Sequence, residues 1–581
     1  MKLLCVLWLA LLMVPAFAAD RPNIVFLIAD DAGWGDCSFN GNSNLSTPSL
    51  DRIAKEGAVL KQFFACPLCA PTRAELLTGR WHSRTGVSGV STGQERLNAD
   101  EQTLADVFKA AGYATGAFGK WHNGSQWPYH PNSRGFTEYY GFTSGHWGEY
   151  FDPPLEHNGE PVRGKGFIAD DITSHAIAFI EEHKLAPFLC WLAFNTPHSP
   201  WAAPTDDWAR FKDKPVTQRA AEGKEDLAET RCALAMMENL DRNAGRVLQK
   251  LEELKLLDNT IVIYLSDNGP NEWRWNGGMR NRKGTTDEGG VRAPCFIRWP
   301  AGGIKAGTVV DHVTAGIDLL PTLAALTGVP RAGDKPLDGR DLSPILLGKT
   351  AAWPDRFIFS HQASKVSARS DQYRLDSDGR LFDIIADPGQ KKNLAAELPE
   401  VAQKMAAAVA AWRREMPPSK RDDRPFPVGH PAAKRTPLPA RDGVPHGGIK
   451  RSAPAPNCSY FVNWNKLEDS ITWDIEVLTA GDYDVELLYT CPLADAGSEI
   501  ELSFLDVKLT AKVQPGWDPP LYTNQDTIPR PPAESKMKEF HPLAAGVMHL
   551  QKGRSLLTLR ALNMPGGSVM DLRQINFIRR Q

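Results

Sequence analysis

Short apolar segments alternate with longer amphipathic ones between residue 23 and about residue 330. Four of the apolar segments are uninterrupted and rich in β-branched or aromatic residues, as strands buried on both faces of a sheet are; they cover residues 23–29, 113–118, 188–194 and 260–265. In the segments between them, apolar residues recur every three or four positions, which predicts helices at 104–111, 171–183 and 231–257. This alternation predicts an α/β domain with a mostly parallel central sheet flanked by helices.

The pattern changes twice after this domain, which we assign to residues 20–354. Residues 355–414 predict a small α+β subdomain, with a few antiparallel strands and a helix near its end. Residues 415–456 are rich in proline and basic residues, which is typical of an extended connector. Residues 457–581 predict an appended β-sandwich, because short alternating strands follow at 470–477, 482–489, 499–504, 555–561 and 574–578.

The N-terminus has the pattern of a secretory signal peptide. Lys2 precedes an apolar stretch over residues 3–17, and Ala16-Phe17-Ala18 is a small-x-small cleavage site. The stretch is short for a membrane span. We therefore expect residues 1–19 to be removed and the protein to be secreted or periplasmic, not membrane-spanning.

Composition and charge exclude only a few classes of function. The 581 residues carry a formal net charge of -3, which gives no basic footprint for nucleic acid. Nine cysteines, one of them in the signal peptide, are too few for a disulfide scaffold. Cys458 and Cys491 are a candidate disulfide pair. Cys66 and Cys69 form a C-x-x-C, which leaves a redox role open, but no second C-x-x-C is present to complete a zinc site.

Polar residues follow each of the four predicted strands. Ligands bind beyond the carboxyl ends of parallel strands, so we expect these residues to meet there; they are Asp30 and Asp31, Lys120 and His122, Asn195 and His198, and Asp267 and Asn268. Carboxylate and amide oxygens suit a hard cation, calcium or magnesium; the candidates are Asp30, Asp31, Asp267 and Asn268. The remaining groups suit an anionic substrate and a leaving group that must be protonated; these are Lys120, His122, His198 and, further along the chain, Lys283.

Cys69 begins a further motif, Cys69-Ala70-Pro71-Thr72-Arg73. Pro71 can occupy a first helical position, which would put Cys69 at a helix N-terminus, where backbone N–H groups and the helix dipole stabilise an anion. An activated thiolate of low pKa is one interpretation. A small buried residue beside a helix start is the other.

The motif continues into Leu76-Leu77-Thr78-Gly79-Arg80, and together the two resemble the signature of type I formylglycine-dependent sulfatases, in the alkaline phosphatase superfamily. The resemblance runs from about Arg21 to Leu394 and includes several separate motifs in the expected order. These are Ala29–Asp36, Gly119–His122, Asn195–His198, Ser266–Gly269, Lys283-Gly284, Glu288–Pro294, Asp387-Pro388 and Asn393-Leu394. Asn123 departs from the pattern, because the family usually has leucine there.

The resemblance implies a role for each candidate residue. Cys69 would be oxidised to Cα-formylglycine by a formylglycine-generating maturation enzyme, and its hydrate would attack the sulfur of a sulfate ester. Calcium, or magnesium, would be held by the four oxygen donors and by the modified Cys69. Arg73 and Lys120 would hold the nucleophile. Lys283 and His198 would contact the sulfate, with His198 protonating the leaving alcohol, and His122 would take the proton that releases sulfate and regenerates the aldehyde.

The implied activity is hydrolysis of sulfate esters, on a sulfated carbohydrate or another sulfate ester. A formylglycine-dependent phosphonate monoester or phosphodiester hydrolase is the nearest alternative. A non-catalytic carbohydrate-binding protein and a thiol–disulfide role for Cys66 and Cys69 are more distant alternatives. The β-sandwich would either bind glycan or be a packing or dimerisation domain. The Trp- and Tyr-rich region 121–157, with His130, His146 and His157, would form the substrate rim or belong to the core.

Overall fold

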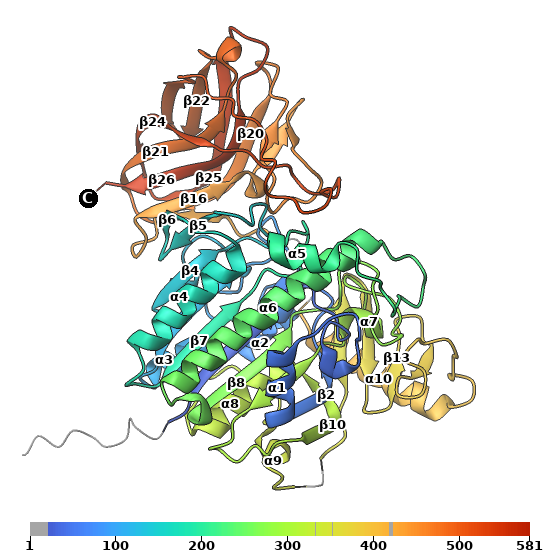
Figure 1. Cartoon of the computed structure of the whole chain (residues 1–581). Helices are drawn as coiled ribbons and strands as arrows, with labels where there is room; N and C mark the ends of the chain where they lie inside the picture. Colours follow the sequence, from blue (N-terminus) through green and yellow to red (C-terminus); the bar gives the residue numbers. More distant parts are fainter. Residues whose placement is uncertain (1–20, 332, 351–352, 418–421, 581) are drawn as a thin grey trace, which may run out of the picture.

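The structure is a computed structural model that describes residues 21–331, 333–350, 353–417 and 422–580 (Figure 1). The predicted signal peptide lies outside these residues. Among the helices in the described ranges, none is both long and apolar enough to cross a membrane.

A ten-stranded mixed sheet forms the centre of the large domain. Its strand order is β10 (Thr308–Ala315), β2 (Ala58–Phe64), β9 (Cys295–Arg298), β8 (Thr260–Ser266), β1 (Asn23–Ala29), β7 (Phe188–Ala193), β3 (Ala114–Lys120), β4 (Glu138–Phe142), β5 (Pro154–His157) and β6 (Glu160–Arg163). The central strands β8, β1, β7, β3 and β4 are all parallel. β1, β7 and β8 are buried along their whole length, as their uninterrupted apolar sequences predict.

Helices cover both faces of this sheet. One layer packs into the core cluster that includes Leu27 and Val262; it contains α1 (Pro48–Glu56), α4 (Ile168–Glu182), α5 (Thr205–Phe211) and α6 (Leu227–Glu253). The opposite layer packs into the cluster that includes Phe26 and Ile263; it contains α2 (Cys69–Thr78), α3 (Leu104–Ala110), α8 (Leu319–Thr327) and α9 (Ser343–Leu346). Alternate residues of one strand thus enter different cores, which is the period of a β-strand. The predicted α/β architecture is confirmed.

The small subdomain and the β-sandwich follow in the expected order. In the subdomain, helix α10 (Pro399–Glu415) packs on an antiparallel sheet of β11 (Ile358–Gln362), β12 (Lys365–Arg369), β13 (Tyr373–Leu375) and β14 (Leu381–Asp383). One sandwich sheet contains β15 (Phe426–Val428), β17 (Val444–His446), β20 (Ser470–Val477), β22 (Glu499–Phe504), β23 (Val507–Lys512) and β25 (Gly553–Asn563). The other contains β16 (Arg435–Pro439), β18 (Lys450–Arg451), β19 (Phe461–Val462), β21 (Gly481–Thr490), β24 (His541–Leu550) and β26 (Asp571–Arg579).

The region expected to be a connector, residues 415–456, contributes four strands to the sandwich. β15 and β17 pair with β20, while β16 pairs with β26 and β18 pairs with β19. These strands are short and lie toward the edges of the sheets, where proline is tolerated because an edge position needs fewer ladder hydrogen bonds. The sandwich therefore begins near Phe426 and not at residue 457.

All eight cysteines of the described ranges are buried free thiols, so the structure does not contain the candidate Cys458–Cys491 disulfide. The Cys458 Sγ instead donates to the His146 carbonyl over 3.0 Å. Figure 1 shows the sandwich seated at one end of the large domain, next to β5 and β6.

Candidate active site

The four strands with polar ends lie side by side in the order β8, β1, β7, β3. Their carboxyl ends are tied together by the backbone: the Asp30 N–H donates to the Thr196 carbonyl over 3.0 Å, and the Asp267 N–H donates to the Ala29 carbonyl over 3.2 Å. Because neighbouring parallel strands end at one edge, residues distant in the sequence meet there, as expected.

Three fully buried carboxylates at this edge each face a cation. Lys120 Nζ lies 2.8 and 2.7 Å from the two oxygens of Asp30. Arg73 donates from Nε and Nη2 to Asp267 Oδ2 over 3.0 and 2.9 Å. Lys283 Nζ lies 2.6 Å from Asp31 Oδ1. The charges of three carboxylates and three cations cancel, so the site formed by the side chains alone is close to neutral.

Asp31 is also the meeting point of two further candidates. Asn268 Nδ2 donates to Asp31 Oδ1 over 2.8 Å, and His198 Nε2 lies 3.5 Å from Asp31 Oδ2. The backbone of Asp31 is left-handed, with φ of 65°, a conformation that L residues adopt at a cost and that is concentrated at functional sites.

The donor set fits a hard divalent cation. Asn268 Oδ1 and Asp31 Oδ2 are buried and accept no hydrogen bond within the described ranges. The ligand atoms of Asp30, Cys69 and Asp267 lie within 4.8 Å of one another. Burial raises the pKa of Asp30 to about 7, with Lys120 opposing the rise and the neighbouring Asp267 and Asp31 adding to it. Crowded oxygens with unused lone pairs are what a cation such as calcium or magnesium would neutralise.

Cys69 is the first residue of α2, as predicted, although Pro71 takes the third position and not the first. Proline is tolerated there because N–H groups of the first turn have no partner inside the helix. Burial raises the pKa of the Cys69 thiol, and Lys120 and Lys283 offset this only in part. The low-pKa thiolate interpretation is therefore wrong for the unmodified side chain.

His122 lies beside the carboxylates and cations of the strand ends without a direct hydrogen bond to them. Its Nε2 is 2.8 Å from the Val90 carbonyl, while its buried Nδ1 has no partner among the described residues. Its backbone is left-handed, with φ of 70°. Burial, and then the charge of Lys120, lower the pKa of His122 well below its ordinary value. A neutral imidazole with a free nitrogen is able to accept a proton.

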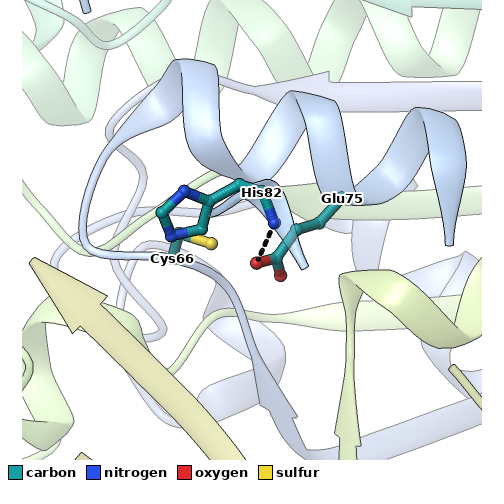
Figure 2. A group of neighbouring side chains, drawn as sticks. All are labelled: Cys66, Glu75 and His82. Atoms are coloured by element: carbon teal, nitrogen blue, oxygen red, sulfur yellow. Dashed lines mark hydrogen bonds between the residues drawn. The ribbon is translucent and has the colours of Figure 1, made fainter. Parts of the chain in front are cut away.

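Cys66 belongs to a buried cluster with Glu75 and His82, separate from the group that contains Cys69 (Figure 2). The His82 backbone N–H donates to Glu75 Oε1 over 3.2 Å. Burial raises the pKa of the Cys66 thiol and of Glu75, the latter to about 8, and lowers the pKa of His82 to about 4. All three groups are thus neutral in the protein, which favours a structural role and argues against a Cys66–Cys69 redox pair.

Two residues near His198 were not predicted from the sequence as participants in the site. His146, weighed only as a rim or core residue, stacks on His198 with ring centroids 5.1 Å apart. Glu534, in the β-sandwich, lies 2.7 Å from His146 Nε2. The sequence carries no signal for Glu534, because only the packing of the two domains brings it to the strand ends.

Comparisons with known proteins identify the family and the fold. The profile of the Sulfatase family matches residues 22–329. N-acetylgalactosamine-6-sulfatase from Canis lupus familiaris is 32% identical over 389 residues, which are 61% of this chain and 71% of that one. The solved structure of Ps i-CgsB in complex with k-i-k-neocarrahexaose has a TM-score of 0.62 at 28% identity and covers 68% of this chain and 94% of that one.

A phosphonate monoester hydrolase of Agrobacterium radiobacter has a similar fold, with a TM-score of 0.52 at 22% identity over 68% of this chain and 96% of that one. At this identity the likeness is one of fold alone. All of these matches leave a large part of the chain uncovered, and the family profile ends before the small subdomain and the β-sandwich.

Proposed function

Because the chain belongs to the sulfatase family, whose members hydrolyse sulfate esters, we propose that it removes sulfate from a sulfated carbohydrate after export to a secreted or periplasmic location. The observation that carries this proposal is the convergence of Cys69, three carboxylates and three cations at the ends of four adjacent strands. The carbohydrate is supported by the names of similar proteins, which include an N-acetylgalactosamine-6-sulfatase and a carbohydrate complex.

The site needs two groups that the chain itself does not encode. Calcium or magnesium, held by Asp30, Asp31, Asp267, Asn268 and the modified Cys69, would polarise the sulfate and the attacking hydroxyl. Formylglycine at position 69, introduced by a maturation enzyme, would supply that hydroxyl from its hydrate. A divalent cation changes the near-neutral charge of the site to about +2, which suits an anionic sulfate ester.

The chain's own residues would then position the reacting groups and transfer the protons. Arg73 binds Asp267 and Lys120 binds Asp30, so these two cations hold the carboxylates in place beside the nucleophile. Lys283 would bind a sulfate oxygen, exchanging part of its contact with Asp31. His198 would give a proton from Nε2 to the leaving alcohol; this requires the imidazolium form, whose pKa burial lowers and the charge of Asp31 raises. His122, neutral and with a free Nδ1, would accept the proton whose loss releases sulfate.

The test begins with the full chain, purified from a host that makes a formylglycine-generating enzyme. We expect mass spectrometry to find an aldehyde at position 69 and kinetics to show turnover of 4-nitrophenyl sulfate. Cys69→Ala should lower kcat by at least about 10⁴-fold, because the nucleophile is lost. An active preparation in which Cys69 is unmodified would overturn the mechanism.

The same variant serves as the control for metal binding. Cys69→Ala keeps the four oxygen donors, so calcium should raise its melting temperature and a chelator should lower it, independently of turnover. Repeating the titration with magnesium identifies the preferred ion. Faster turnover of an aryl phosphonate than of the matching aryl sulfate would replace the proposal by the phosphonate hydrolase alternative.

A further inference from the structure

One segment of the β-sandwich reaches out of that domain and packs against the strand ends of the catalytic sheet. This β23–β24 segment, residues 513–540, joins two sandwich strands. Gln525 Oε1 accepts from the Tyr150 and Phe151 N–H groups over 2.7 and 2.9 Å. Ile528 is buried in the core cluster of the catalytic domain. The segment is therefore anchored by backbone recognition and by shared core, and not by surface contact alone.

Glu534 is the residue of this segment that comes nearest to the proposed chemistry. Its Oε2 lies 2.7 Å from His146 Nε2, and its Oε1 accepts from Ser199 Oγ over 3.0 Å. The side chains of Glu534, His146 and His198 are only 8%, 5% and 9% exposed. Burial alone would raise the pKa of Glu534, but His146 outweighs it and lowers that pKa to about 2, so the carboxylate is charged.

Both partners of Glu534 contact His198. The His146 ring is parallel to the His198 ring, with an interplanar angle of 11°. The Ser199 carbonyl lies 2.5 Å from His198 Nδ1, which fixes the N–H of that nitrogen and leaves Nε2 toward Asp31. Tyr150, whose backbone is held by Gln525, donates from its hydroxyl to the His198 carbonyl over 2.8 Å. Three residues thus orient His198, and each of them is held by Glu534 or Gln525 of the β23–β24 segment.

A buried carboxylate beside a site for an anionic ester is electrostatically unfavourable unless its own contacts offset the repulsion. Glu534 forms an ion pair with His146 and accepts a hydrogen bond from Ser199, and a charged acceptor fixes such partners more firmly than a neutral one. We propose that the β-sandwich completes the active site and that Glu534 is a positioning residue, holding His146 and Ser199 and through them the imidazole of His198. The role of His198 in this inference rests on the proposed function.

The test compares Glu534→Gln with wild type on two sulfate esters of different leaving group. Phenol is a poorer leaving group than 4-nitrophenol and needs more help from a proton donor. If Glu534 aligns that donor, kcat on phenyl sulfate should fall roughly tenfold or more, while kcat on 4-nitrophenyl sulfate should fall less than about threefold. Glu539→Gln, in the same segment but half-exposed, is the matched control and should change neither.

Glutamine keeps the size of the side chain, so folding is checked simply by an unchanged melting temperature. Equal losses on the two esters, or no loss on either, would overturn the inference while leaving the proposed function intact. If wild type turns over neither ester, the proposed function fails and the inference is decided by crystallography. It then fails if His146 and the 195–200 loop keep their positions in Glu534→Ala.

Discussion

At the scale of single residues, buried charges in the site are held by contacts that few other side chains could make. Arg73 is fully buried and makes three hydrogen bonds, two to Asp267 and one to the Lys120 carbonyl. Its planar guanidinium satisfies two strand ends at once, which an ammonium cannot do. The opposite side of α2 is built differently, because Cys66, Glu75 and His82 have no countercharge there and remain neutral.

Glu75 gives this neutral cluster a measurable pH dependence. Burial raises its pKa from 4.5 to about 8, so the folded state keeps a proton that the unfolded state releases. The free energy of unfolding should therefore decrease as pH rises from 4.5 to about 8. Glu75→Gln cannot lose that proton and should be more stable than wild type at pH 8 by on the order of 3 kcal/mol, with little difference at pH 5. Calorimetric unfolding at both values measures this.

Glu400→Gln is the control for this experiment. Glu400 lies in the first turn of α10 and is exposed, so its replacement should leave the pH dependence of unfolding as in wild type. Curves for Glu75→Gln and wild type that run parallel from pH 5 to pH 8 would contradict a neutral Glu75.

At the scale of elements, the ends of β1 and β3 place their functional residues through unusual backbone conformations. Asp31 and His122 have left-handed backbone conformations, and so does Gly119, the second-last residue of β3, with φ of 97°. At Gly119 the β3 backbone passes close to β7, and a Cβ would lie 2.0 Å from the Ala193 carbonyl oxygen. The absence of a side chain at this position allows Lys120 to enter the site.

Gly119→Ala should therefore break the site as well as strain the chain. We expect a loss of more than about 3 kcal/mol in stability and of nearly all turnover, because β3 and β7 must separate. Gly112→Ala is the matched control: its φ is 87°, but a Cβ there meets nothing within 4 Å. It should cost only about 1–2 kcal/mol and keep kcat. The experiment measures the melting temperature and kcat of both variants. If the two substitutions lower them equally, backbone strain alone, and not the contact with β7, is responsible.

The sequence predicted these elements well where the pattern was strong and local. Strands such as 23–29 and 470–477 match the structure residue for residue, because uninterrupted or alternating apolar residues leave one choice. The β23 and β24 strands were missed, although β23 alternates strictly between half-buried and exposed residues; in β24 the exposed positions break the alternation. Proline and basic residues concealed β15–β18, and three of these strands, β15, β16 and β17, pair with strands much further along the chain.

At the scale of the whole molecule, the same limit applies to the site. The strand-end residues could be predicted because topology gathers them at one edge. The contact of Glu534 with His146 could not, because it depends on how two domains pack and no local pattern encodes that. The cavity between these domains, about 460 Å³, is lined by five cations, Arg163, Arg435, Arg441, Lys538 and Arg573, and by four carboxylates, Glu149, Glu156, Glu486 and Glu539. This near balance favours a structural interface over a second site for a polyanion.

The dependence of the catalytic domain on the sandwich leads to a last prediction. A cut at residue 457 would split the sandwich, since β15–β18 precede it, so the informative truncation ends at Pro417. This chain lacks Glu534 and Ile528 and loses the ion pair between Arg96 and Asp422, 3.2 Å apart. We expect it to lose at least about 100-fold in turnover of both 4-nitrophenyl sulfate and a sulfated polysaccharide, because the site itself is incomplete. A detachable glycan-binding sandwich predicts the opposite, with the small ester still cleaved and only the polymer affected. Leu556→Ser, on the exposed surface of the sandwich, controls for mere disturbance of that domain and should keep both activities.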